Sequence, residues 1–247
     1  MQPTYLPWIG YFDLIDQADV FILDDLAAVQ RKSWQTRNLI RARDGRAVWL
    51  TVPITAHQDT RLCDVKIAPQ PWRRKHRATL EHAYGDAPHW NDLRITVDLI
   101  GDPWIHLTML TEALIRSLAE HLGITTRIVL ASRLARLRHG RLERLADMLQ
   151  SVAATELLDT AGARDVLGVD EIEGIPIRWH QYEHPVYDQG GVSFMSHLSV
   201  VDLIAWHGPE SLNIIRLGRR AATGGADVTA LPDEIIWPAG IPSHLWP

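Results

Sequence analysis

The feature that most constrains the fold is the alternation of short β-rich runs with longer segments of helical periodicity. The run from Ala47 to Ile54 (AVWLTVPI) is continuous and has a proline near its end, which predicts a strand buried on both faces. Further short runs indicate strands at residues 20–23, 64–67, 127–130, 155–158 and 175–182. Because strands that alternate with helices tend to pair in parallel, the sequence predicts an α/β protein with a mostly parallel central sheet flanked by helices.

Helical segments dominate the middle of the chain. After Pro7, a residue that suits the first helical position, apolar residues recur at helical spacing to about residue 18. Longer helices are expected over residues 72–84 and 103–122, each closed by a glycine, and over 142–150. The middle of the molecule should therefore be rich in helix.

The C-terminal part begins with a helix start signal. Ser199 lies three residues before Asp202 at the head of an apolar run, which is the pattern of a capping box, and a last helix is expected from about Pro209. The tail after Arg219 carries glycines and prolines with little periodicity. We therefore expect residues 1–218 to form one domain and residues 219–247 to form an irregular wrap or tail.

Charge and cysteine content limit the possible partners. Acidic residues outnumber basic ones by 30 to 25, so the net charge of −5 argues against a nucleic-acid partner. Cys63 is the only cysteine, which excludes an internal disulfide and a thiolate-rich metal site. No stretch approaches the roughly 20 apolar residues that span a bilayer, and the start lacks the pattern of a signal peptide. A cytoplasmic location is expected, while the oligomeric state is left open.

Several familiar catalytic patterns are missing from the sequence. No His-Glu-x-x-His metal motif occurs, and no metal site is predicted. Neither a Gly-x-Ser-x-Gly elbow nor a phosphate-binding P-loop is present. These absences argue against the usual zinc hydrolases, serine hydrolases and NTPases.

Asp24 and Asp25 directly follow the predicted strand 20–23, where open α/β sheets commonly present their chemistry. A carboxylate there could hold a hydroxylated or cationic substrate, coordinate a hard metal or take a proton. Adjacent strand residues point in opposite directions. We therefore expect one of the pair to face a pocket and the other to cap a turn or pair with Arg31 or Lys32.

Trp34, Arg37 and Asn38 lie in a segment without strong periodicity. A guanidinium fork at Arg37 could grip a carboxylate or phosphate, and the amide of Asn38 could fix its orientation. The alternative is an ion pair between Arg37 and one of the two aspartates, with Trp34 packed over the arginine stem.

Two further sets of residues are candidates for substrate binding. Gln2 and Tyr5 lie on a proline-bounded loop that enters the first helix, and loop residues held in this way are suited to ligand contacts. Trp8 follows them, and its alternative role is in the core. His76 and Tyr84 are eight positions apart on the predicted helix 72–84, so they would line the same face.

His184 is the first candidate for a proton-transfer residue. Imidazole titrates near neutral pH, and Pro185 stiffens the loop that presents it. Tyr187 or Asp188 would orient the ring. The alternative is a histidine that only hydrogen-bonds its own loop.

The sequence contains, in order, the blocks QPTYLPWIGYF (2–12), DD (24–25), SWQTRN (33–38), WLTVP (49–53), HPVYDQ (184–189) and LS with DL (198–203). In these residues it resembles the WbqC-like family of bacterial biosynthetic-cluster proteins. The resemblance implies an accessory enzyme of O-antigen, other surface-polysaccharide or secondary-metabolite biosynthesis. The HPVYDQ block adds Tyr187 and Gln189 to the candidate substrate-binding residues.

The chain departs from the family pattern in two places. Relatives usually carry an apolar strand that ends in histidine before Gln-Pro, whereas this chain has Met1 there, so that position supplies no acid, base or ligand. The first strand of the family is expected to be missing. Residues 155–160 (TELLDT) also replace a hydroxyl-rich stretch of the family.

The leading hypothesis is an enzyme that transfers an acyl or aminoacyl group to an amine of a sugar or carrier-bound intermediate. Arg37 and Asn38 would anchor an anionic group, and Asp24 or Asp25 would hold the acceptor. His184 would remove the proton. The stretches near residues 24, 37 and 184 must then meet around one polar cavity. No cofactor is predicted beyond an activated acyl or nucleotide-sugar donor. The alternatives are a noncatalytic binding or scaffolding protein and an isomerase or lyase.

Overall fold

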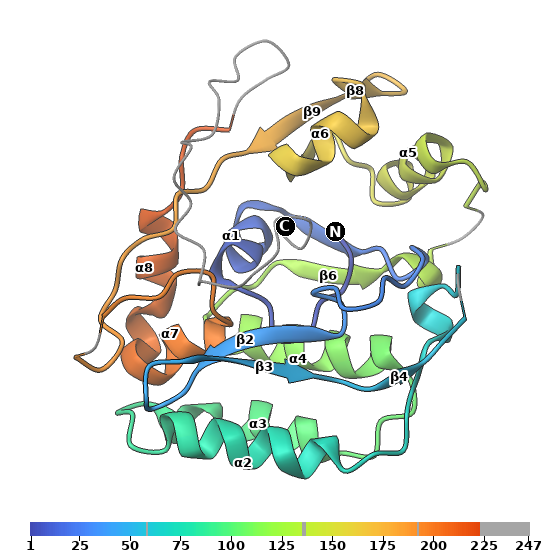
Figure 1. Ribbon diagram of the computed structural model, residues 1–247. Helices are drawn as coiled ribbons and strands as arrows, with labels where there is room; N and C mark the ends of the chain where they lie inside the picture. The colour runs from blue at the N-terminus through green and yellow to red at the C-terminus, as the bar shows by residue number, and fades with distance from the viewer. Residues whose placement is uncertain (58, 135–136, 192, 223–247) are drawn as a thin grey trace.

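The computed structural model describes residues 1–57, 59–134, 137–191 and 193–222. The predicted α/β class is confirmed, because helices surround several small sheets and the central sheet is parallel (Figure 1). Most of the predicted C-terminal wrap, from residue 223 onward, lies outside the described residues.

The central parallel sheet consists of only two strands. Strand β1 (Val20–Leu23) pairs with β6 (Arg127–Leu130), as the apolar runs predicted, and helix α1 (Ile9–Gln17) precedes it. The other edge of β1 is bonded to Met1. The terminal ammonium group donates to the carbonyl of Ile22 at 3.2 Å, and the amide of Asp24 donates to the carbonyl of Met1 at 2.8 Å.

The β-rich run at residues 47–54 forms two strands rather than the one long buried strand that was predicted. β3 (Ala47–Thr51) forms an antiparallel hairpin with β2 (Arg37–Arg41), and only Leu50 of β3 is buried. Pro53 interrupts the run because proline has no amide hydrogen for the ladder. The chain resumes as β4 (Ile54–Thr55), which pairs with β5 (Lys66–Ile67), where residues 64–67 were predicted as a strand.

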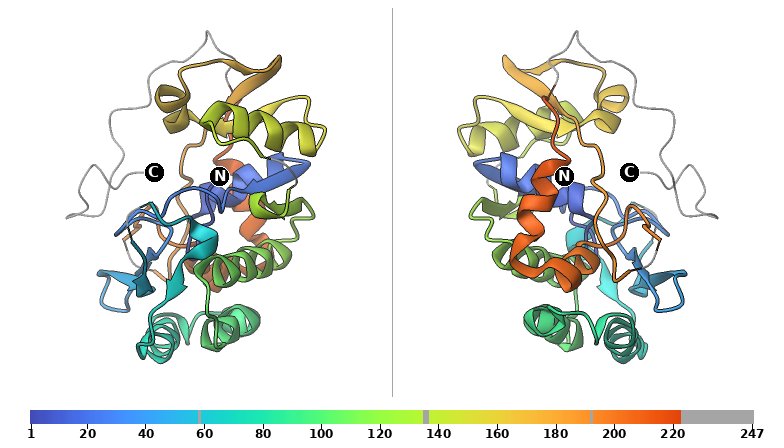
Figure 2. Two further views of the ribbon diagram at one scale, coloured as in Figure 1. Left: turned by 90° about the vertical axis from the view of Figure 1, so that its right-hand side faces the viewer. Right: turned by 90° about the vertical axis from the view of Figure 1, so that its left-hand side faces the viewer.

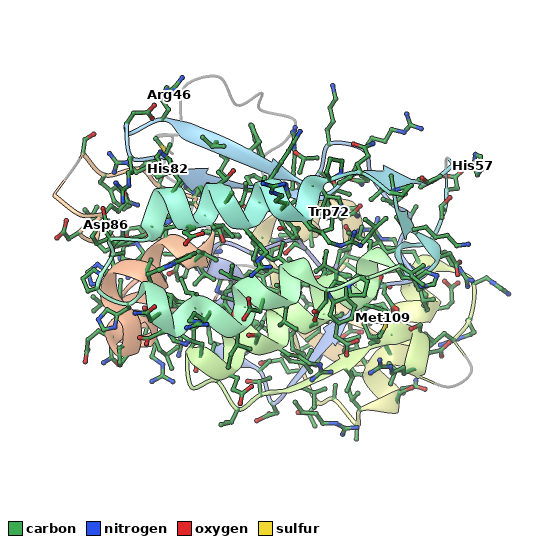
Figure 3. All side chains as sticks on the ribbon, turned by 90° about the horizontal axis from the view of Figure 1, so that it is seen from below. Arg46, His57, Trp72, His82, Asp86 and Met109 are labelled. Atoms are coloured by element: carbon green, nitrogen blue, oxygen red, sulfur yellow. The ribbon has the colours of Figure 1, made fainter. Side chains whose placement is uncertain are left out.

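The helical middle is packed on one side of the sheets. α2 (Trp72–Tyr84) ends at its predicted glycine, and it packs with α3 (Arg94–Gly101), which the sequence did not indicate. α4 (Leu107–His121) starts later than predicted because residues 103–106 run as an extended segment. Seen from below, α2 covers this side of the molecule, with Trp72 at its start and Asp86 just past its end (Figure 3).

An outer unit lies on the side of α1 that faces away from helices α2, α3 and α4, as both side views show (Figure 2). We use this name for residues 141–180, which form α5 (Arg141–Ser151), β7 (Leu157–Thr160), α6 (Ala161–Leu167), β8 (Glu171–Ile172) and β9 (Ile175–His180). The strands pair in the order β7-β9-β8, parallel between β7 and β9. The outer unit has a small hydrophobic core of its own, centred on Trp179.

The C-terminal helices α7 (Val200–His207) and α8 (Ser211–Leu217) pack beside α1 and β2. The hydroxyl of Ser199 accepts the amide of Val201, so the predicted cap is present. The reciprocal half of a capping box is absent, because the Asp202 carboxylate accepts side-chain hydrogen bonds instead. None of the helices in the described ranges combines the length and apolar character that crossing a lipid bilayer requires.

Candidate functional site

A cavity of about 840 Å³ lies between the N-terminal part of the chain and the outer unit. The N-terminal loop, α1 and β1 form one wall, and α5, β7 and the end of β9 form the other (Figure 1). Since β1 and β7 are each the edge strand of a sheet, the cavity separates the two sheets. Its volume lies within the roughly 300–1,000 Å³ of small-molecule sites.

Asp24 and Asp25 diverge at the end of β1. Asp24 lines the cavity, and its Oδ1 is buried without a hydrogen-bond partner among the described residues. Asp25 points into the protein, where it accepts the amide of Ser132 at 2.8 Å and the Ser132 hydroxyl at 2.6 Å. Asp25 therefore caps a turn, whereas Asp24 is available to a ligand.

Arginines from the outer unit face Asp24 across the cavity. The guanidinium of Arg144 lies 3.6 Å from the Asp24 carboxylate, and Arg141 precedes it by one helical turn of α5. Arg178 of β9 also lines the cavity and bonds Glu156 at 2.8 Å. Sequence reasoning missed all three arginines because they lie outside the family blocks.

His180 lies at the end of β9 on the cavity wall. Its Nε2 is 2.7 Å from Oδ2 of Asp13, a carboxylate of α1 that is fully buried. Neither residue was among the predicted site residues. The predicted strand 175–182 contains His180 but extends past it, so the position of this histidine at a strand end was not visible in the sequence.

Other predicted residues hold the N-terminal loop against the cavity. The Gln35 side chain donates to the side-chain oxygen of Gln2 at 2.6 Å, and both residues line the cavity with Trp34. Asn38 reaches the cavity too, but its amide group donates to the carbonyl of Leu6 at 2.7 Å and is buried. Thr4, also on the cavity wall, has a buried hydroxyl without a partner in the described ranges.

Arg37 does not join this cavity. Its guanidinium lies over the ring of Trp49, 4.0 Å from the ring centroid, and burial lowers its pKa. Trp34 packs against the same indole at 5.4 Å. In the described residues Arg37 thus stacks on Trp49, and the predicted alternative, an ion pair with Asp24 or Asp25 beneath Trp34, is not formed.

Tyr5 and His76 form a buried pair on the opposite side of the N-terminal loop. The hydroxyl of Tyr5 lies 2.8 Å from Nδ1 of His76, and the ring of Trp72 packs on both. Burial lowers the pKa of His76 to about 4. This pair sits in the core, so neither residue lines the cavity.

Three more predicted residues converge on Asp202, which sequence reasoning treated only as a helix-cap residue. Tyr187 donates to its carboxylate at 3.0 Å and Gln189 at 2.9 Å, while Arg41 donates to Gln189 at 3.0 Å. Tyr84 completes this Asp202 network by accepting the amide of Arg41. Desolvation raises the pKa of Asp202 to about 6. All five side chains are buried, and none of them lines the cavity.

His184 lies in an aromatic cluster behind Trp8. It stacks on Trp8 with the ring centroids 6.1 Å apart, and the ring of His197 lies tilted beside it at 5.1 Å. Its Nδ1 is 2.9 Å from the carbonyl of Pro185. Burial lowers its pKa to about 4. Trp8 lines the cavity but His184 does not. The stretches near residues 24, 37 and 184 thus fail to meet in one cavity. Arg37 lies against Trp49, and His184 lies against Trp8.

No cluster of three histidine, cysteine or acidic side chains suited to a metal ion occurs within the described residues. The residues with acidic or basic side chains that line the cavity are carboxylates, arginines and one histidine, namely Asp19, Asp24, Glu156, Asp159, Arg141, Arg144, Arg178 and His180. Such groups can bind a polar organic ligand and exchange protons with it.

The fold is that of a mixed α/β protein with a cavity between two small sheets. The sequence matches the WbqC-like protein family over residues 2–214, and the chain belongs to that family. The uncharacterised protein Rv1507c of Mycobacterium tuberculosis is similar to it, with 31% identity over 229 residues, which cover 89% of this chain and 97% of the relative. No solved structure matches the chain.

Proposed function

We propose that the cavity binds a small molecule that carries both an anionic group and an amine or hydroxyl group. We further propose that the protein transfers an acyl or aminoacyl group to that amine during the biosynthesis of a surface polysaccharide or secondary metabolite. The observation that carries the proposal is Asp24, whose buried Oδ1 has no partner in the described chain although its other oxygen lies 3.6 Å from Arg144. A buried polar atom left without a partner costs stability unless a ligand completes it.

Each charged group has a place in this scheme. The amine or hydroxyl group of the substrate donates a hydrogen bond to Oδ1 of Asp24. A phosphate or carboxylate binds Arg144 and Arg141, since guanidinium groups form paired hydrogen bonds with both anions. Arg141 is exposed and makes no ion pair or hydrogen bond with the described residues, so it is free to bind.

The chemical step is nucleophilic attack by the acceptor amine. Its nitrogen forms a bond to the carbonyl carbon of an activated donor, such as a thioester, and the carbon–sulfur bond breaks. The amine loses one proton and the departing thiolate gains one. A base on the cavity wall has to carry that proton.

The first test is a thermal-shift and calorimetric screen with nucleotide-linked amino sugars and acyl thioesters. A ligand that binds the native state raises the melting temperature in proportion to its saturation. For the ligand that emerges, Asp24→Asn and Arg144→Gln should each weaken binding by about 10- to 100-fold, as expected for the loss of a charged hydrogen bond. Arg94→Gln, an exposed arginine at the start of α3 outside the cavity, is the matched control.

Unchanged affinity in both cavity variants would contradict the proposed site. Catalysis and simple binding separate in the same experiment. Group transfer predicts release of the donor thiol with a defined turnover, whereas a scaffolding protein would bind the ligand and release nothing.

A further inference from the structure

We infer that His180, held by Asp13, is the residue that accepts the proton in this cavity. The inference rests on the proposed function and adds a catalytic residue and a positioning residue to it. It starts from the hydrogen bonds of Asp13, which belong to no motif noted in the sequence.

Asp13 is a fixed and fully buried hydrogen-bond acceptor. Its Oδ2 accepts Nε2 of Gln17 at 2.7 Å and lies 2.7 Å from Nε2 of His180. Its Oδ1 accepts Nε of Arg219 at 3.0 Å. Two donors besides the imidazole thus hold the carboxylate in one orientation, and the carboxylate in turn fixes the histidine.

The carboxylate also determines the tautomer of His180. An acceptor at 2.7 Å from Nε2 requires the hydrogen on Nε2, which leaves the lone pair on Nδ1. No other residue of the described chain hydrogen-bonds Nδ1. The ring plane is set by stacking on Tyr182 at 5.8 Å with an interplanar angle of 14°.

An oriented imidazole backed by a carboxylate is the arrangement that general-base catalysis requires. In the transfer step, the attacking amine gives its proton to Nδ1 of His180. Asp13 stabilises the imidazolium that forms, and the proton then passes to the departing thiolate. The base is restored, and no further reactant is needed.

His180 is better placed than His184 to accept a proton from a ligand in the cavity. His184 has its Nδ1 beside its own loop carbonyl, and its Nε2 is buried without a partner in the described ranges. It lies behind Trp8, whereas His180 is part of the cavity wall.

The test uses diethyl pyrocarbonate, which acylates an unprotonated imidazole nitrogen with loss of an ethyl carbonate group. Modification of the full chain is followed by mass spectrometry of the peptides that contain His180 and His184. His180 is only 7% exposed, but it lines the cavity and its Nδ1 has no partner in the described chain, whereas Nδ1 of His184 lies against the carbonyl of Pro185 and its Nε2 is buried. We expect the reagent to reach His180 through the cavity and His184 to stay unmodified until the protein unfolds. A His180 that is inert in the folded protein would overturn the inference.

Asp13→Asn tests the positioning role. Because Arg219 needs an acceptor at Oδ1, the asparagine turns its amide group toward His180 and Gln17, which share the other position. Gln17 can rotate its own amide to accept, whereas the imidazole must move its hydrogen onto Nδ1. We expect the acylation rate of His180 to fall by about 10-fold or more. The long-range proton–nitrogen spectrum of the imidazole should change from the Nε2-protonated to the Nδ1-protonated pattern.

Asp16→Asn is the matched control, since Asp16 pairs with Arg216 and Arg219 but not with His180. It should leave the rate and the spectrum unchanged. Equal rates in wild type and Asp13→Asn would overturn the positioning role. With a substrate identified, His180→Gln should lower turnover by about 100-fold or more and leave affinity within a few-fold. A loss of binding alone would overturn the catalytic role and assign His180 to ligand recognition. The proposed ligand site is tested separately, by the affinities of Asp24→Asn and Arg144→Gln.

Discussion

The cavity and the Asp202 network are both assemblies of charged and polar side chains, but one is open and the other is closed. In the Asp202 network Oδ2 of Asp202 accepts two donors from the chain, whereas Oδ1 of Asp202 and Nε of buried Arg41 have no partner in the described residues. In the cavity, Oδ1 of Asp24 and the guanidinium of Arg141 also have no partner in the described chain, but both residues line a space that a ligand can enter. An unpartnered polar group therefore indicates a ligand only where a ligand can reach it.

The sharpest way to break this comparison is Asp202→Ala. Removing the carboxylate leaves Tyr187 and Gln189 without their hydrogen-bond acceptor. It also removes the negative charge nearest to buried Arg41. Each buried donor that loses its acceptor costs about 1–3 kcal/mol of unfolding free energy, and here two donors lose theirs. Urea denaturation monitored by fluorescence measures this loss directly.

Asp202→Asn is the control for that variant, because one oxygen remains to accept both donors. It should cost much less than the alanine. If Asp202→Ala lies within about 1 kcal/mol of wild type, the network is not part of what holds the fold together.

The sequence predicted the elements of the fold better than it predicted the site. Strands 20–23 and 127–130 and helix 72–84 were found because local apolar periodicity determines them. The division at Pro53 was missed, since burial of residues 47–54 depends on a partner that the local pattern does not reveal. The α3 helix, only eight residues long, gave no signal of its own.

The candidate site was predicted only in part for a related reason. Gln2, Asp24 and Trp34 do line the cavity. Tyr187 and Gln189 looked like ligand contacts, but they bind Asp202, which a capping pattern had already seemed to explain. A motif lists polar residues and does not distinguish a partner within the chain from a ligand outside it.

Acid should lower the stability of the folded protein mainly through buried histidines that lie outside the cavity. The folded-state pKa of His184 is lowered to about 4 and that of His197 to about 3, both by burial. Between these values and the ordinary pKa near 6.5, the unfolded chain binds protons that the folded chain does not. The stability from these groups is therefore complete above pH 6.5 and is lost as the pH falls toward 4.

Asp202 acts in the opposite direction, because its folded-state pKa is raised to about 6. Its contribution is complete below the ordinary carboxyl pKa near 4 and is lost as the pH rises to 6. Together with His76, whose pKa burial also lowers to about 4, His184 and His197 outweigh one carboxylate, so the unfolding free energy should fall between pH 6.5 and 4.5. His184→Gln should flatten that slope in urea titrations, and an unchanged slope would refute the assignment.

The smallest expected effect on stability is that of Asp24→Asn, and it sharpens the comparison most. Asp24 and Arg144 are about a quarter exposed and 3.6 Å apart, so their pairing contributes little, within about 1 kcal/mol. Asp25→Asn is the matched variant at the next position, where an amide cannot accept both the Ser132 amide and the Ser132 hydroxyl. It should cost about 1–3 kcal/mol. Equal losses in the two variants would assign Asp24 to the fold and remove the strongest reason for placing a ligand beside it.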